Sequence, residues 1–368
     1  MEHLTHLADP QTIRQSLKAV IQLAEQYKKE NGRIPVLMEV CGSHTMAFAK
    51  SGIKTILKDH VQLIAGPGCP VCVTDQKSID AMIELSKDKN RILCTFGDMM
   101  RVPGSRFSLM DAKTEGKDIR VVYSPLDSIK IAQENPHKEV IFLGIGFETT
   151  IPVLAVTVQE AEKQALTNYS IWMSTKLVEP VLRELLNSKE INIDGFLLPG
   201  HVSVVTGKNN YNFLAEDFLI SGVISGFEPI ELLRGIYKLL HLLLNNKIDI
   251  INDYTYMVKN EGNRVAKKLM EHYFDYHDEA WRGIGVIPKS SLILKESYAQ
   301  FDAQKKFHVS LSEPRKTKCR CGEIIRGMIT PEECVLFNKG CTPLRPIGPC
   351  MVSTEGTCAA HYHYMREE

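Results

Sequence analysis

The sequence lacks an excess of charge of either sign. Its 368 residues contain 44 Lys and Arg against 44 Asp and Glu, so the net charge is zero when the histidines are neutral. A protein that holds nucleic acid or an anionic membrane through its overall electrostatic field needs a basic excess. We therefore expect no nucleic acid and no membrane among its partners.

Long apolar segments are also missing. No apolar run reaches the roughly 18 residues that a membrane-spanning helix needs, and the first segment, MEHLTHLADPQTIRQ, has neither the basic nor the apolar region of a secretory signal. We expect a soluble, cytoplasmic protein. Because disulfide frameworks are rare in the cytoplasm, the ten cysteines indicate metal or redox chemistry.

Short apolar runs that end in polar, Gly- or Pro-containing turns recur through the first two thirds of the sequence. Helical stretches lie between them, such as Gln76 to Asp88 and Pro152 to Ala165. This alternation is typical of parallel sheets covered on both faces. We expect an α/β fold with two doubly wound parallel-sheet domains that face a cleft, followed by a C-terminal cysteine-rich iron–sulfur domain. The expected strands lie in segments 34–40, 61–65, 91–96, 119–124, 139–147, 194–198 and 219–225.

The domain boundaries follow from the same alternation. Residues 1–125 would form an N-terminal helix and the first α/β domain, residues 126–245 the second, and residues 246–368 a helical segment and the iron–sulfur domain. The seam is placed near Leu126 because the succession of strands and helices restarts there. Asp9 followed by Pro10 predicts where the N-terminal helix begins, as its N-cap and first helical residue.

Six of the ten cysteines fall in the segment after Lys318, with the spacing C-x-C-x12-C-x6-C-x8-C-x7-C. Thiolates select zinc or iron–sulfur clusters, but a structural zinc usually has four ligands in close C-x2-4-C pairs. A disulfide framework would suit a small secreted domain instead. Six cysteines favour a four-cysteine cluster beside a redox-active pair, although spacing alone does not select the four. The six are Cys319, Cys321, Cys334, Cys341, Cys350 and Cys358.

Cys41 and His44 form a C-x-x-H motif at the end of an expected strand, where a helix begins. A helix N-terminus lowers the pKa of a thiol, and a histidine three residues later would share a face with the cysteine or cap it. The motif therefore suits a nucleophilic or metal-binding thiolate. The alternative is a buried, inert cysteine with a structural histidine.

A second motif, Gly-Pro-Gly-Cys69-Pro-Val-Cys72, follows the next expected strand. C-P-x-C at a strand-to-helix turn is the arrangement of dithiol oxidoreductases. The alternatives are a zinc half-site or a plain tight turn. Cys94 lies inside an apolar strand, and we expect it in the core.

Three further polar residues follow expected strands: Asp98, Glu148 and His201. Each of them alone is more often a helix cap than a catalytic residue. Ligands of parallel sheets bind beyond the carboxyl ends of the strands. The three residues would therefore line one cleft beside Cys41 and Cys69.

Taken together, seven segments resemble the hydrogenase maturation factor HypD family, and the resemblance extends from about Ile34 to Tyr364. The combination of CGSH, GPGCPVC and the six-cysteine segment is the most specific part of it. The segments are MEVCGSHTMAF, GPGCPVC, FGDMMRVPGS, GIGFETT, LPGHVSVVTG, SGFEPIELL and CRCGEIIRG with CTPLRPIGPCMVSTEGTCAA.

The resemblance implies a scaffold more than a conventional enzyme. A HypD-like protein pairs with the small chaperone HypC and holds an iron atom while two cyanides, delivered by HypE with HypF, and one carbon monoxide are attached. The unit then passes to the large subunit of [NiFe]-hydrogenase. By similarity, Cys41 would bind the iron transiently, His44 would support it, and Cys69 and Cys72 would be a redox-active pair in the same cleft.

The family's cluster surroundings are similar to those of ferredoxin:thioredoxin reductase, in which a [4Fe–4S] cluster lies against a disulfide. The similarity implies Cys321 and Cys350 as the neighbouring redox pair. One alternative is a free-standing iron–sulfur thiol–disulfide oxidoreductase, and another is a zinc-stabilised binding module. The cluster ligands that the similarity implies are Cys319, Cys334, Cys341 and Cys358.

Overall fold

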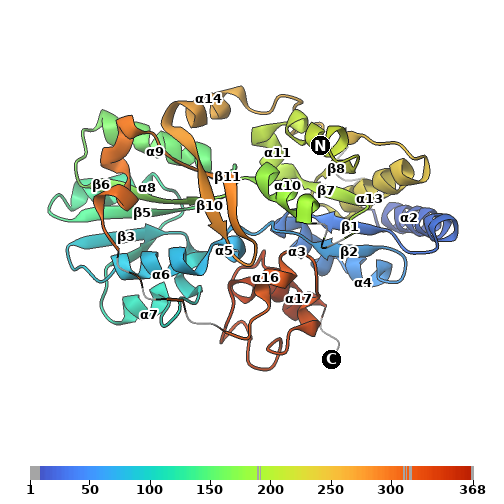
Figure 1. Ribbon diagram of the computed structural model, residues 1–368, viewed down its shortest axis with the longest axis horizontal. Helices are drawn as coiled ribbons and strands as arrows, with labels where there is room; N and C mark the ends of the chain where they lie inside the picture. Colours follow the sequence, from blue (N-terminus) through green and yellow to red (C-terminus); the bar gives the residue numbers. More distant parts are fainter. Residues whose placement is uncertain are drawn as a thin grey trace.

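The computed structural model describes residues 9–188, 190, 192–309, 311, 313–314 and 317–365. The outer ends of the expected first and last domains, residues 1–8 and 366–368, lie outside these ranges. Figure 1 shows two sheet-containing halves side by side, with a long hairpin between them and the C-terminal segment below. Within the described ranges, every helix is too short or too polar to cross a membrane.

The first sheet has five parallel strands in the order β2-β1-β7-β8-β9. Both of its faces are covered, because Leu37 of β1 packs into one hydrophobic cluster and its neighbour Met38 into another. The strands are β1 (Val36–Glu39), β2 (Gln62–Ala65), β7 (Gly195–Pro199), β8 (Ser221–Ser225) and β9 (Ile250–Asn252). The helices that follow or cover them are α2 (Pro10–Asn31), α3 (Gly42–Lys50), α4 (Ile53–Leu57), α11 (Gly200–Thr206), η3 (Lys208–Tyr211), α12 (Asn212–Glu216) and α13 (Pro229–Leu244).

The second sheet has four parallel strands in the order β4-β3-β5-β6. It too is apolar on both faces, with Ile141 and Phe142 of β5 in different clusters, as expected for strands buried on both sides. The strands are β3 (Arg91–Thr95), β4 (Ile119–Val121), β5 (Glu139–Gly146) and β6 (Tyr169–Thr175). The helices of this half are α6 (Gln76–Leu85), η2 (Gly97–Arg101), α7 (Leu109–Thr114), α8 (Asp127–Glu134) and α9 (Ile151–Lys163).

The two parallel sheets confirm the expected α/β class, but strand pairing departs from the expected seam near Leu126. Strands β1 and β2 pair with β7, β8 and β9, whereas β3 to β6 form the other sheet. The chain therefore leaves the first sheet after β2 and returns to it through α10 (Val178–Ser188). The apolar pattern of a buried parallel strand does not show which strand it pairs with, so the alternation of strands and helices does not show which sheet each strand joins.

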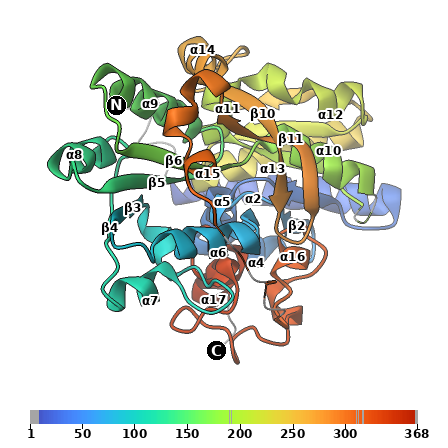
Figure 2. The ribbon, with the colours of Figure 1, turned by 60° about the vertical axis from the view of Figure 1, so that its left-hand side comes forward.

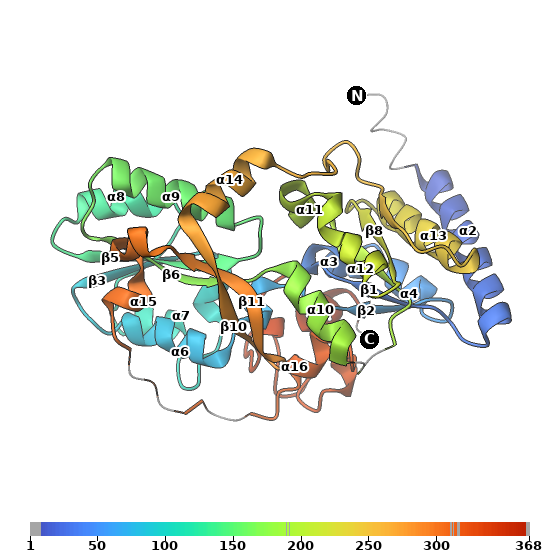
Figure 3. The same cartoon turned by 45° about the horizontal axis from the view of Figure 1, so that its top comes forward.

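An antiparallel hairpin joins the halves after β9 and α14 (Arg264–Tyr273), and Figure 3 shows it running between them. The hairpin is held to the second half by the Leu177 N–H, which donates to the Ser290 carbonyl at 2.9 Å. The buried Lys176 ammonium also lies 3.3 Å from the Glu279 carboxylate. The hairpin strands and the helices after them are β10 (Phe274–Trp281), β11 (Gly285–Leu294), η4 (Glu296–Phe301) and α15 (Ala303–Lys306).

The C-terminal segment contains short helices and turns, and its described residues form no extended strand. It packs between the halves: α17 contacts α3, and η6 contacts α5 (Pro70–Val73). Figure 2 shows this segment beneath both sheets. Its helices are α16 (Cys321–Ile324), η5 (Pro331–Glu333), η6 (Pro349–Met351) and α17 (Thr357–Tyr364).

Candidate functional site

Cys41 lies where β1 ends and is the N-cap of α3, as the sequence predicts. Its side chain is buried, and burial raises the pKa of the thiol to about 11, with the Glu355 carboxylate adding to the rise. The backbone N–H groups of His44 and Ser43 act in the opposite direction but do not compensate. The expected lowering of this pKa by the helix N-terminus is therefore outweighed by desolvation. Cys41 is a protonated thiol until a base or a metal ion takes its proton.

The GPGCPVC loop lies directly against Cys41. The Gly42 N–H donates to the Gly68 carbonyl at 3.2 Å, and a Cβ on Gly68 would lie only 2.5 Å from the Cys41 backbone nitrogen. Glycine is therefore the residue that allows the two loops to meet. Cys69 and Cys72 form a disulfide across the first turn of α5, with their Cα atoms 5.2 Å apart.

His44 is fully buried three residues after Cys41. Its Nε2 lies 3.0 Å from the Gly226 carbonyl and 3.3 Å from the Ser225 carbonyl. Since a carbonyl only accepts, Nε2 carries the proton. Burial lowers the pKa of the ring to about 4. The ring is therefore neutral, and Nδ1 offers a buried lone pair that has no hydrogen-bond partner among the described residues.

An aromatic stack connects His44 to His201. The Phe227 ring lies 4.7 Å from the ring of His44 and stacks on that of His201 at 4.0 Å. Burial lowers the pKa of His201, and the Glu355 carboxylate opposes this effect. His201, at the start of α11, is thus part of the same site as Cys41.

A loop of the C-terminal segment closes over these residues. Ser43 donates its hydroxyl hydrogen bond to Glu355 at 2.6 Å, and Ser353 donates to the Asp98 carboxylate at 2.9 Å. Asp98 therefore joins the site through the C-terminal loop. Sequence reasoning missed Glu355, Ser353 and Phe227. The signals were present in the polar stretch between the last two cysteines and in the turn after β8.

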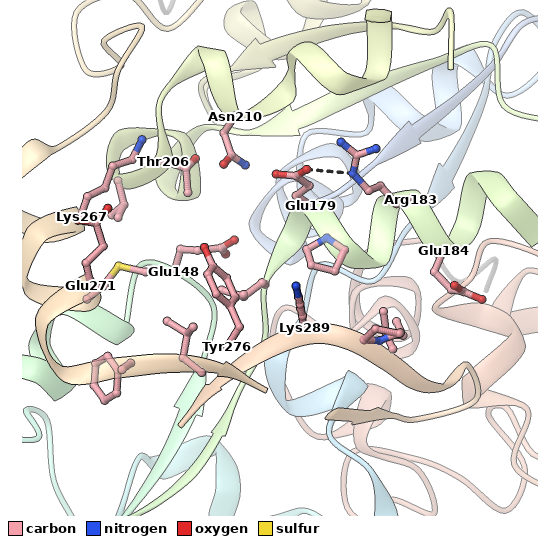
Figure 4. Close-up of a pocket in the computed structure, with 18 of the residues that line it drawn as sticks. Glu148, Glu179, Arg183, Glu184, Thr206, Asn210, Lys267, Glu271, Tyr276 and Lys289 are labelled. Atoms are coloured by element: carbon pink, nitrogen blue, oxygen red, sulfur yellow. Dashed lines mark hydrogen bonds and ion pairs between the residues drawn. The ribbon is translucent and has the colours of Figure 1, made fainter. Parts of the chain in front are cut away.

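Glu148 faces a different space. It lines a cavity of about 690 Å³ between α10, α11, α14 and the hairpin, and Figure 4 shows its carboxylate among the other lining side chains. The Val178 N–H donates to one carboxylate oxygen at 2.8 Å, and the other oxygen is buried without a partner among the described residues. Burial raises the pKa of Glu148 to about 7. The lining residues of this cavity do not include Cys41 or Cys69.

All six cysteines of the C-terminal segment line one small cavity with apolar walls. The sulfurs of Cys321 and Cys350 form a close pair 2.7 Å apart, and the side chains of Cys319 and Cys358 interact with this pair. Among the described residues, no three His, Cys, Asp or Glu side chains converge closely enough to hold a single metal ion. The four cysteines outside the pair are the residues that could hold a cofactor: Cys319, Cys334, Cys341 and Cys358.

The two groups of cysteines are neighbours. The helix that contains Cys72 packs on η6, which contains Cys350. Arg282 bridges the same region, because its backbone N–H donates to the Val73 carbonyl at 2.8 Å and Gly283 packs directly on Gly322. The Cys69–Cys72 disulfide and the C-terminal cysteines therefore share one core.

The fold and the site together define a two-sheet α/β protein in which a cysteine-rich C-terminal segment covers a strand-end cysteine site. A family model described as "HypD: Hydrogenase formation hypA family" matches residues 12–365. The chain therefore belongs to the HypD family, as its motifs predicted.

Several similar proteins are named as hydrogenase maturation factors. The chain is 41% identical over 364 residues to HypD of Escherichia coli (strain K12), which covers 98% of this chain and 97% of that protein. It is 39% identical over 370 residues to HypD of Rhodobacter capsulatus, covering 99% and 98% of the two chains. It is 43% identical over 338 residues to HypD2 of Bradyrhizobium diazoefficiens, covering 89% of each.

Proposed function

We propose that this protein acts in hydrogenase maturation as a scaffold that holds an iron atom on Cys41 while cyanide and carbon monoxide ligands are attached to it. Its partners in this role would be a HypC-type small chaperone and the cyanide-delivering pair of HypE and HypF, and the hydrogenase large subunit would receive the product. The names of the similar proteins support the general role.

The observation that carries the proposal is the pairing of a buried thiol with a buried, neutral imidazole. Cys41 supplies a soft thiolate once its proton is lost, and soft ligands suit an iron atom that carries cyanide and carbonyl groups. His44 keeps its Nε2 proton on the Ser225 and Gly226 carbonyls, so the Nδ1 lone pair is available to the iron or to the proton that Cys41 releases. Burial of both side chains also excludes bulk water.

The C-terminal cysteines would hold a [4Fe–4S] cluster. Each iron of such a cluster takes its own thiolate, so the four sulfurs surround the cluster instead of converging on one point. Four of the cysteines lie around an apolar cavity, and among the described residues no group of side chains converges on a single ion. This arrangement suits a cluster better than a single zinc ion. When bound, the cluster would supply single electrons next to the Cys321–Cys350 pair.

The other residues around Cys41 would exchange electrons or position the surrounding loops. Cys69 and Cys72, held against Cys41 by the Gly68 contact, would exchange electrons with the C-terminal pair as disulfide and dithiol. His201 and Asp98 would position the loops that surround the iron, since each contacts the enclosing elements and neither reaches the Cys41 sulfur by a hydrogen bond within the described residues.

Iron analysis tests the scaffold proposal. The protein is co-purified with its small partner, and iron and sulfide are counted for the parent, Cys41→Ala and Cys94→Ala. Cys94 is the matched control, because it is also a buried thiol but lies in the core, on β3. We expect Cys41→Ala to keep the cluster iron and to lose the additional iron. Loss of the additional iron from both variants would contradict a specific role for Cys41.

The Cys69–Cys72 disulfide favours a second candidate, a free-standing thiol–disulfide oxidoreductase. Such an enzyme would reduce a disulfide substrate catalytically, with an external reductant and without a partner, and Cys41→Ala would leave that turnover intact. A zinc-stabilised module is the third candidate, and zinc in the absence of iron and sulfide would identify it.

A further inference from the structure

A third cavity, of about 540 Å³, opens beside the C-terminal cysteines. Its wall includes the start of α6, the hairpin turn at Arg282, and the residues around Cys319 and Cys321. Cys350 is not among its lining residues and is only 1% exposed. A molecule in this cavity would therefore reach the Cys321–Cys350 pair from the Cys321 side.

The wall of this cavity carries an excess of positive charge. It contains Lys77, Arg282, Arg320 and Arg326 against Glu313 and Glu323. Three of the four cations have carboxylate partners: Arg320 pairs with Glu323, Arg326 with Glu190, and Lys77 with Glu313 at 4.0 Å.

Arg282 is different, because its hydrogen bonds go to uncharged groups. Its Nε donates to the Thr74 carbonyl at 3.0 Å and its Nη1 to the Gln76 side-chain oxygen at 2.9 Å. Its Nη2 is buried and has no partner among the described residues. The guanidinium charge is therefore not neutralised by a carboxylate.

We propose that this cavity admits a small anionic thiol that reduces a disulfide between Cys321 and Cys350, and that Arg282 supplies the charge that attracts it. The inference rests on the proposed function, in which these two cysteines are a redox pair. A fixed positive charge in a partly enclosed cavity raises the local concentration of anions. It also favours the anionic form of the attacking sulfur over the neutral thiol.

The reaction balances with two thiol molecules. The first thiolate attacks the Cys321 sulfur, forms a mixed disulfide and releases Cys350 as a thiolate, which takes up a proton. The second thiolate attacks the sulfur of the bound thiol, so that an external disulfide leaves and Cys321 is released and protonated. Two electrons pass from the two external thiols to the protein disulfide.

Mixed-disulfide trapping tests which sulfur is attacked. Cluster-loaded Cys350→Ser and Cys321→Ser proteins are treated with glutathione disulfide, and the modified peptides are identified by mass spectrometry. We expect an adduct on Cys321 in the first variant and none on Cys350 in the second. An adduct on Cys350, or on neither cysteine, would overturn the proposed entry site.

A separate measurement checks the redox pair itself. The parent protein is oxidised, and the Cys321–Cys350 disulfide is sought by peptide mapping. If that disulfide does not form, the proposals of a redox pair and of an entry site are both wrong. If the disulfide forms but the trapped adduct is on Cys350, only the entry site fails.

A series of thiols of different charge tests the role of Arg282. We measure how fast mercaptoethanesulfonate, mercaptoethanol and cysteamine each reduce the Cys321–Cys350 disulfide. Each rate is then divided by the rate at which the same thiol reduces a small uncharged disulfide. We expect the corrected rate of the anionic thiol to exceed that of the cationic thiol by about tenfold at low salt. The ratio of the two rates should fall towards one at high salt, because salt screens the charge. Equal corrected rates would overturn the proposal.

Two variants test which side chains cause the preference for an anionic thiol. Arg282→Gln should bring the ratio of anionic to cationic rates close to one. Because Arg282 also donates to Thr74 and Gln76, Lys77→Ala serves as a second variant at an exposed side chain, and it should lower the ratio in part. A ratio that both variants leave unchanged contradicts the proposal even if one of them is poorly folded.

Discussion

His44 is a buried residue whose protonation should make stability depend on pH. In the unfolded chain its imidazole takes up a proton below its ordinary pKa of 6.5, whereas in the fold it stays neutral down to about 4. Because the unfolded state then binds more protons, the free energy of unfolding should fall by about 3 kcal/mol as the pH drops through that window. His44→Gln should remove this dependence, measured as the denaturation midpoint against pH. If the denaturation midpoints of parent and variant change with pH in the same way, His44 is not the group responsible for this pH dependence.

Glu148 should show the opposite dependence. Its pKa is raised from 4.5 to about 7 by burial, so between these values the folded state binds the extra proton and stability falls as the pH rises. Glu148→Gln should therefore gain about 3 kcal/mol relative to the parent between pH 4.5 and 8. The same denaturation series measures this gain. If the free energies of unfolding of parent and variant differ by the same amount at pH 4.5 and at pH 8, the carboxyl group is not buried as described.

At the scale of single residues, the sequence predicted where Cys41 and His44 lie better than how their side chains behave. The positions of Cys41 and His44 at a strand end followed from the pattern of apolar runs. The pKa of Cys41 did not, because the helix N-terminus was visible in the sequence while the burial that outweighs it depends on Glu355 and the C-terminal loop. Those contacts join residues about 300 positions apart.

The contact between the two cysteine loops depends on Gly68. Gly68→Ala would place a methyl group 2.5 Å from the Cys41 backbone, so the loops must separate. We expect a loss of about 1–3 kcal/mol in stability, measured by denaturation, and faster alkylation of Cys41. Gly97→Ala is the control, because its nearest neighbour would be a Val121 methyl group at 3.8 Å. Equal effects of the two substitutions would count against the contact.

The C-terminal loop that covers Cys41 should control the reactivity of this cysteine. Glu355→Gln removes a charge that raises the pKa of Cys41 and weakens the hydrogen bond from Ser43. Both changes increase access to the thiolate, so alkylation by iodoacetamide at pH 8 should become several-fold faster. Glu313→Gln, at an exposed carboxylate away from Cys41, should leave the rate unchanged. A slower or unchanged rate in Glu355→Gln would show that the loop does not cover Cys41.

The sequence also predicted individual elements more reliably than their pairing. Each of the seven expected strand segments contains a strand, and Asp9 caps α2 through its side chain as expected. Among the parallel strands, β6 and β9 were missed, and strand pairing does not follow the seam near Leu126, because the first sheet combines β1 and β2 with the distant strands β7, β8 and β9. Local apolar pattern and capping residues determine an element, whereas pairing depends on contacts that the pattern does not encode.

For the molecule as a whole, the proposed division of the C-terminal cysteines makes a spectroscopic prediction. Serine at any one of the four cluster positions should abolish or strongly reduce the visible absorption of the purified protein, because a thiolate ligand is lost. Cys321→Ser and Cys350→Ser should retain it, since the proposal assigns these two sulfurs, 2.7 Å apart, to the redox pair and not to the cluster. Loss of colour in Cys350→Ser with colour kept in Cys358→Ser would exchange the roles of those two cysteines. The four cluster positions are Cys319, Cys334, Cys341 and Cys358.

The adjacency of the two cysteine groups is a property of the whole fold. The chain crosses between the sheets and returns before the C-terminal segment packs against both, which brings Cys72 and Cys350 onto helices that touch. Sequence motifs identified the two groups separately. Their proximity comes from the tertiary packing of α5 on η6.

Infrared spectroscopy of the protein co-purified with its small partner tests the central claim most directly, since cyanide and carbon monoxide bound to iron absorb where polypeptides do not. The account predicts cyanide and carbonyl bands in the parent complex and in Cys94→Ala, and none in Cys41→Ala with its cluster intact. Bands of full intensity in Cys41→Ala would contradict it.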